Sequence, residues 1–245
     1  MRNISLNKTK QWLKHSDTPL AKTLFAQIKT IRRLEIPAPR LAVTPLYFIY
    51  CFLRTLVTTL TRILWWTPLL KGRCDSVGRN LNLFGGLPFI SGSLKISIGD
   101  DCRVSGHTTF SGRTCAQQIP ELRIGNNVDI GYMTTIAIGQ KVDIGNNVRI
   151  AGHAFLAGYP GHPLDAKARA SGQPETDDQV GNIILEEDVW LATNVSVLAG
   201  VRIGQGTIVA TGSVVTRDLP AMVLAAGIPA RVIRHLNKPE NKTNQ

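Results

Sequence analysis

Aromatic side chains are scarce in this chain of 245 residues, at 6% of the sequence, and there are only four cysteines. The cysteines form no CxxC motif and no spacing typical of a metal site, so we expect reduced thiols, a cytoplasmic protein and no bound metal. No apolar core followed by a small-residue cleavage site opens the chain, which predicts no cleavable signal peptide. Few aromatics beside 22 glycines favour a thin, stacked aliphatic core of the kind found in repeat proteins.

Acidic residues are almost missing from the first part of the chain. Residues 1–76 contain thirteen Lys and Arg but three acids, a net charge of +10, whereas the remainder carries +1. An anionic partner recognised by charge should therefore meet this arm. Its apolar faces suit the anionic cytoplasmic face of an inner membrane, and no motif indicates a nucleic-acid-binding fold.

Two segments of the arm have helical patterns. The sequence Ser16–Pro19 is typical of a helix start, and Pro37 should end that helix. An apolar stretch from Leu46 to Leu64 is followed by two tryptophans and places Arg54 and Arg62 on one face. We interpret it as an amphipathic helix lying in a membrane interface. The alternative is a helix packed on the following domain or on a neighbouring subunit.

An aliphatic residue returns at every sixth position near the C-terminal end, at Leu185, Leu191, Val197, Ile203, Val209 and Val215. This period predicts a parallel β-helix whose coils contain three six-residue faces. Looser repeats start at Val77, Leu83 and Phe89. An irregular stretch, 111–121, and a long insertion, 159–182, interrupt the repeat, and a loop of that length inside a regular solenoid indicates function.

Four motifs extend this pattern: GHPLD (161–165), DVWLATNVSVLAGVRIG (188–204), ATGSVVTRDLP (210–220) and AAGIPARVIR (225–234). With them the chain resembles the hexapeptide-repeat acyltransferases, in particular galactoside and maltose acetyltransferases and sugar O-acetyltransferases of polysaccharide biosynthesis. The resemblance implies an all-β, left-handed parallel β-helix that uses acetyl-CoA and forms a homotrimer. We expect a basic helical arm over 1–76, the β-helix over 77–236 with a short C-terminal extension, and a polar tail at 237–245.

The GHPLD match implies a catalytic histidine at His162. An alcohol is a weak nucleophile at neutral pH, so its attack on a thioester needs a base such as imidazole. Asp165 either orients His162 or stabilises a turn of the loop. The resemblance also implies a coenzyme A groove along the last coils, with matched positions at Thr193, Thr211, Thr216, Arg217, Arg231 and Arg234. We expect Tyr132, Met133 and His153 to contact the acceptor.

The leading hypothesis is an acetyl-CoA-dependent O-acetyltransferase whose acceptor is a sugar or glycan, with a lipid-linked sugar suggested by the arm. A non-sugar acceptor is an alternative. A β-helical carbonic anhydrase would need three closely placed histidine ligands, and His153 and His162 lack a third partner. A membrane-associated scaffold without catalysis is the third alternative, and an intact GHPLD motif speaks against it.

Overall fold

The computed structural model describes residues 3–236, so the predicted polar tail lies outside the described residues. The chain divides into two compact units, Met1–Arg54 and Thr55–Gln245. In the first unit α1 (Asn3–His15) packs against α2 (Pro19–Arg32), and Ala21 is fully buried. Thr18 is the N-cap of α2 and Pro19 its first residue, as a proline with preset φ favours.

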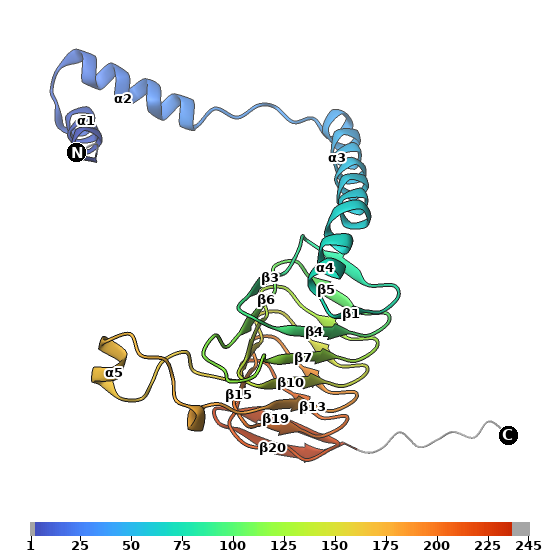
Figure 1. Ribbon diagram of the computed structural model, residues 1–245. Helices are drawn as coiled ribbons and strands as arrows, with labels where there is room; N and C mark the ends of the chain where they lie inside the picture. Colours follow the sequence, from blue (N-terminus) through green and yellow to red (C-terminus); the bar gives the residue numbers. More distant parts are fainter. Residues whose placement is uncertain (1–2, 237–245) are drawn as a thin grey trace. The chain divides into compact units, whose positions relative to one another are not determined.

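Three sheets of stacked strands, parallel except for the final β19–β20 pair, form most of the second unit (Figure 1). Sheet A contains β1 (Ser76–Val77), β4 (Lys95–Ile98), β7 (Glu121–Ile124), β10 (Lys141–Ile144), β13 (Ile183–Leu185) and β16 (Arg202–Ile203). Sheet B contains β2 (Asn82–Phe84), β5 (Arg103–Ser105), β8 (Asp129–Ile130), β11 (Arg149–Ile150), β14 (Trp190–Leu191), β17 (Ile208–Val209), β19 (Val223–Gly227) and β20 (Ala230–His235). Sheet C contains β3 (Phe89–Ser91), β6 (Thr109–Gly112), β9 (Thr135–Ile138), β12 (Phe155–Ala157), β15 (Ser196–Leu198) and β18 (Val214–Val215).

The chain visits the sheets in the order A, B, C, so each circuit is one coil of a parallel β-helix. We call the turns between them the A–B, B–C and C–A corners. Equivalent aliphatic residues stack in register inside the prism, as Ile150 does on Leu191 and Leu191 on Val209. These side chains are at most 2% exposed. The sequence-based prediction of a parallel β-helix is confirmed. The six-residue period arises because each face of a coil buries an aliphatic side chain at the equivalent position.

One predicted core position was wrong. Phe89 is 66% exposed, whereas the next residue, Ile90, pairs with Phe110 and packs against the core. The corner between Leu83 and Ile90 holds one residue more than a regular repeat, and its two glycines, Gly85 and Gly86, have positive φ. Because successive strand residues point to opposite sides, a shift by one residue turns Phe89 outward.

Polar ladders stabilise the A–B corner. The amide of Asn127 donates to Asn147 and the amide of Asn147 donates to Asp188, each at 2.9 Å. All three residues have φ between 53° and 60°, in the left-handed region that Asn and Asp tolerate best after glycine. The repeated IGNN sequences are therefore corner residues stacked on one another.

A continuous helix of 34 residues, Arg40–Arg73, precedes the β-helix. It consists of α3 (Arg40–Thr61), a π-helical turn (Arg62–Trp66) and α4 (Thr67–Arg73). Helical structure thus continues past the tryptophans at which the sequence pattern suggested an end, and Thr67–Pro68 begins α4, where a proline is tolerated.

The C-terminal part of this helix docks on the first coil. Leu70 is fully buried and Trp66 packs against the core. Arg62 donates to Asn82 Oδ1 at 2.8 Å, and Arg73 donates to the carbonyl of Leu94 at 3.1 Å. Within α3, in contrast, Arg40–Thr61 contains no buried residue. Arg62 is therefore engaged by the β-helix, while the apolar side chains of α3 remain exposed.

Candidate functional site

Two insertions leave the β-helix at the C–A corner. The shorter one, 113–120, joins β6 to β7, and the longer one, 158–182, joins β12 to β13. The long insertion carries α5 (Ala166–Ala170) and a short 3-10 turn, Asp177–Gln179, and α5 projects away from the stacked sheets (Figure 1). Both insertions therefore leave the same corner two coils apart, with the short turn between β9 and β10 lying between them.

A cluster of ion pairs around the buried Arg113 joins these two insertions. Arg113 Nε lies 2.5 Å from Glu175 Oε1, and Arg113 Nη1 lies 2.6 Å from Asp177 Oδ1. Arg113 also donates to the backbone carbonyl of Glu175 at 3.1 Å. The side chains of Arg113 and Glu175 are only 4% and 5% exposed. Near the base of the loop, Ser111 and Tyr159 share a hydrogen bond of 2.9 Å.

Burial and hydrogen bonding act in opposite directions on Glu175. Burial alone raises the pKa of its carboxyl group, but hydrogen bonds from its own backbone N–H and from Arg113 outweigh that effect and lower the pKa. The Cys115 thiol donates to the same carboxylate at 3.2 Å, and its own pKa is raised by burial and by this contact. Glu175 is therefore a stable anion at neutral pH and fixes the end of the long insertion.

His162 lies near the start of the long insertion and is exposed. Its backbone carbonyl accepts a hydrogen bond from Gln179 Nε2 at 3.4 Å. Arg169, at the end of α5, donates to the carbonyls of Pro163 and Leu164 at 2.9 and 2.7 Å. The backbone around His162 is thus tied to two other parts of the loop, while its imidazole is accessible.

Asp165 is the N-cap of α5. Its Oδ1 accepts a hydrogen bond from the backbone N–H of Ala168 at 2.8 Å. This contact corresponds to the turn-stabilising alternative considered from the sequence, and an orienting role toward His162 stays a prediction.

The predicted acceptor residues come together at the B–C corner. The ring of Tyr132 lies 4.7 Å from that of His107 and 6.2 Å from that of His153, measured between centroids. Met133 follows Tyr132 in the same turn, and both Met133 and His153 have positive φ. Within the part of the chain that the structure describes, no group of three or more His, Cys, Asp or Glu is placed to hold a metal ion.

The predicted coenzyme A residues fall on three parts of the β-helix. Thr193 and Thr211 occupy equivalent B–C turns on adjacent coils, and the N–H of Gly212 donates to the carbonyl of Thr193 at 3.0 Å. Thr216 and Arg217 directly follow β18 at the end of sheet C. Arg231 and Arg234 lie on β20, which pairs antiparallel with β19 at the edge of sheet B. The structure groups them in pairs and does not collect all six in one place.

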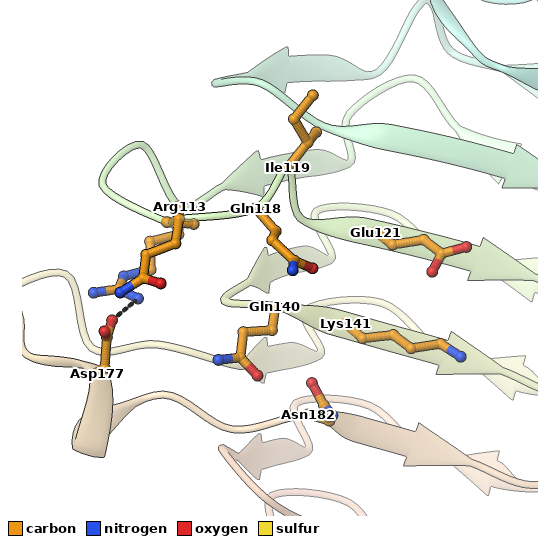
Figure 2. Close-up of a pocket in the computed structure, with 10 residues that line it drawn as sticks. Arg113, Gln118, Ile119, Glu121, Gln140, Lys141, Asp177 and Asn182 are labelled. Atoms are coloured by element: carbon orange, nitrogen blue, oxygen red, sulfur yellow. Dashed lines mark hydrogen bonds and ion pairs between the residues drawn. The ribbon is translucent and has the colours of Figure 1, made fainter.

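A cleft of about 450 Å³ opens between the two insertions (Figure 2). Its lining includes the amide side chains of Gln117, Gln118, Gln140 and Asn182 and the charged side chains of Arg113, Glu121, Lys141 and Asp177. In Figure 2 the Arg113–Asp177 ion pair forms one end of this cleft.

The repeat in the last coils matches a known family of proteins. Residues 182–217 match the model of the bacterial transferase hexapeptide (six repeats). The last coils of this chain therefore carry the hexapeptide repeat of bacterial transferases. This confirms the resemblance seen in the sequence motifs, of which DVWLATNVSVLAGVRIG (188–204) lies entirely within the matched residues.

Several curated proteins are similar to this hexapeptide-repeat chain. A galactoside O-acetyltransferase of Escherichia coli (strain K12) is 36% identical over 116 residues, which are 47% of this chain and 55% of that protein. A 2,3,4,5-tetrahydropyridine-2,6-dicarboxylate N-acetyltransferase of Staphylococcus aureus (strain JH9) is 37% identical over 95 residues, 39% of this chain and 34% of that protein. The matched part of the chain thus spans little more than half the length of this galactoside O-acetyltransferase and of a similar curated relative.

A solved structure supports the fold of this hexapeptide-repeat chain. A mutant of AntD, an N-acyltransferase from Bacillus cereus in complex with dTDP-4-amino-4,6-dideoxyglucose and Coenzyme A, aligns with a TM-score of 0.57 at 22% identity. The alignment covers 70% of this chain and 89% of AntD. At this identity the similarity concerns the β-helix fold.

Sequence reasoning did not find Arg113 or Glu175 in this hexapeptide-repeat chain. Both lie in insertions that follow no period, so no pattern predicted that they would meet. The only available signal was that each insertion interrupts the repeat at the same corner, which becomes apparent once the coils are aligned by register.

Proposed function

We propose that this protein is an acetyl-CoA-dependent O-acetyltransferase that modifies a hydroxyl group of a sugar or glycan, in the biosynthesis of a surface polysaccharide. The observation that carries this proposal is His162, an exposed imidazole on a loop tied down by the ion pairs of the buried Arg113. The hexapeptide repeat, a galactoside O-acetyltransferase among the relatives and a neighbour bound to coenzyme A support acyl transfer.

In the proposed reaction the imidazole of His162 accepts the proton of the acceptor hydroxyl. The oxygen attacks the thioester carbonyl of acetyl-CoA, and backbone N–H groups stabilise the oxyanion that forms. The carbon–sulfur bond then breaks, and the proton on His162 passes to the departing thiolate. The small corner residues Thr193 and Thr211 allow close approach of the pantetheine chain, and exposed arginines such as Arg217 suit its phosphates.

The placement of the predicted residues supports a homotrimer. The loop with His162 leaves the C–A corner, whereas Thr211, Tyr132 and His153 occupy the B–C corner of the same chain. A second copy would bring these two sets together at an interface. Sheet C faces outward with exposed apolar side chains, Phe155 at 42% and Leu198 at 39%, which suit such an interface. We also propose that the coil of the β-helix is left-handed.

Two of the similar proteins point to a second kind of acceptor. The relative from Staphylococcus aureus and AntD are both N-acyltransferases, which favours an amino group as the second candidate acceptor. An imidazole base can take a proton from either group. A screen with labelled acetyl-CoA, using amino sugars and hydroxyl-bearing sugars in parallel, distinguishes the two candidates.

We further propose that the protein is cytoplasmic and attaches to the cytoplasmic face of the inner membrane through its basic arm. The helix over Arg40–Arg73 is long and apolar enough to cross a membrane by length and composition, and α3 has no buried residue. Full-length protein should sediment with vesicles that contain phosphatidylglycerol. Leu53→Glu in α3 should weaken that binding, whereas Leu164→Glu, an exposed leucine in the long insertion, should not.

Replacement of His162 tests the central proposal. His162→Ala should lower acetyl transfer by about 10²–10⁴-fold, because general base catalysis contributes that much, while acetyl-CoA binding measured by calorimetry persists. His15→Ala, an exposed histidine of α1, is the matched control and should retain full activity. An unchanged rate for His162→Ala would contradict the base role, and failure of the wild type to bind acetyl-CoA would favour a scaffold.

A further inference from the structure

The cleft between the two insertions is polar but carries little net charge. Arg113 is neutralised by Glu175 and Asp177, and Lys141 lies 3.0 Å from Asp143 Oδ2. Glu121 adds one carboxylate. Such a site does not match a phosphate-rich ligand, which would need unpaired cations.

Side-chain amides supply most of the free hydrogen-bonding groups in the cleft. Gln118, Gln140 and Asn182 are exposed, and within residues 3–236 no hydrogen bond joins their side-chain amides to another residue. Each amide offers both donors and an acceptor, which is the complement of a hydroxyl group. Figure 2 shows Gln118, Gln140 and Asn182 close together along the cleft, on three successive levels of the C–A corner.

The cleft and His162 share one anchored segment of chain. Asp177 lines the cleft and begins the 3-10 turn that ends at Gln179, whose side chain reaches the carbonyl of His162. Arg113, which forms an ion pair with Asp177, belongs to the shorter insertion. A ligand in the cleft would therefore contact the same structure that positions His162.

We propose that this cleft is a subsite for an uncharged, hydroxyl-rich saccharide unit of the acceptor, next to the unit that receives the acetyl group. The volume of about 450 Å³ lies within the range of small-molecule sites. No lining residue is aromatic, so hydrogen bonds from the amides provide recognition. That the ligand is part of the acceptor rests on the proposed function. That it is uncharged and rich in hydroxyl groups follows from the lining of the cleft.

Binding measured without acetyl-CoA tests the subsite independently of catalysis. The probes are the neutral tetrasaccharides maltotetraose and cellotetraose and the charged tetragalacturonate, titrated into full-length protein by calorimetry. At least one neutral probe should bind, and more tightly than the charged probe. The double variant Gln118→Ala/Gln140→Ala should weaken that binding by about tenfold, since each lost hydrogen bond contributes modestly.

Gln173→Ala is the matched control, because Gln173 is an exposed glutamine of the same insertion that does not line the cleft, and its binding should equal that of the wild type. Absence of binding by both neutral probes, or equal binding by wild type and double variant, overturns the subsite. Acetyl transfer that needs His162 but has the same KM in the double variant also overturns it and leaves the proposed function standing. Saccharide binding lost in the double variant, with no transfer by the wild type, supports the subsite and contradicts the proposed function.

Discussion

Arg113 Nε and Glu175 Oε1 lie 2.5 Å apart although 62 residues separate them in the chain. Both side chains are almost completely buried, and the pair joins one insertion of the β-helix to the other. Charges removed from water need well-placed partners, and here a second carboxylate and a backbone carbonyl complete the set around Arg113. The pair therefore determines where the end of the His162 loop is held.

Removal of Arg113 should free this loop. Arg113→Met leaves Glu175 buried without its cation, a change that costs about 3–5 kcal/mol in comparable pairs. Because the loop can detach locally, we expect the cost to appear as loop opening, with cleavage between 159 and 182 about 10²-fold faster under limited proteolysis. Arg123→Met is the control, since Arg123 is exposed and 3.7 Å from Asp143. Equal cleavage rates in both variants would contradict an anchoring role for Arg113.

The anchored loop should loosen in acid. The pKa of Glu175 in the folded protein is lowered, so the unfolded state binds more protons at low pH. Its stabilising contribution is fully present above the pKa of an unperturbed glutamate, about 4.3, and is lost as pH falls through the folded value. The protection of residues 159–182 from hydrogen exchange, compared between pH 6 and pH 3, measures this loss. The Glu175→Gln variant should be less protected than the wild type at pH 6, and its protection should change less over the same interval.

Asp165 offers a test that separates capping from catalysis. Asn is as good an N-cap as Asp but carries no charge, so Asp165→Asn preserves the hydrogen bond to Ala168. Because the structure uses Asp165 as a cap, we expect Asp165→Asn to keep kcat and the pH profile within about twofold, while Asp165→Ala destabilises α5 by about 1 kcal/mol. A large fall in kcat for Asp165→Asn, with a shifted pH profile, would instead support a role in orienting His162.

The sequence predicts those parts of this protein that repeat and misses those that do not. The aliphatic period places Ile150, Leu191 and Val209 correctly, because each fills an equivalent inward position. It fails at Phe89, where one extra corner residue changes which side chain points inward. A motif indicated His162, but Arg113 and Glu175 are joined only by tertiary contact between two irregular segments.

Asn147 shows why asparagine recurs in the corners of the β-helix. A φ of 59° is strained for most residues that have a Cβ, and Asn and Asp tolerate it best. The Asn147 side chain also links Asn127 to Asp188 through the polar ladder. Asn147→Gly and Asn147→Ala both remove the ladder bonds, but only alanine also resists the left-handed conformation. We expect the glycine variant to be more stable by about 1 kcal/mol in urea unfolding. At Asn126, in the same corner but with ordinary φ, alanine should be the more stable replacement by about 0.5–1 kcal/mol. The same order at both positions would show that backbone conformation does not select asparagine here.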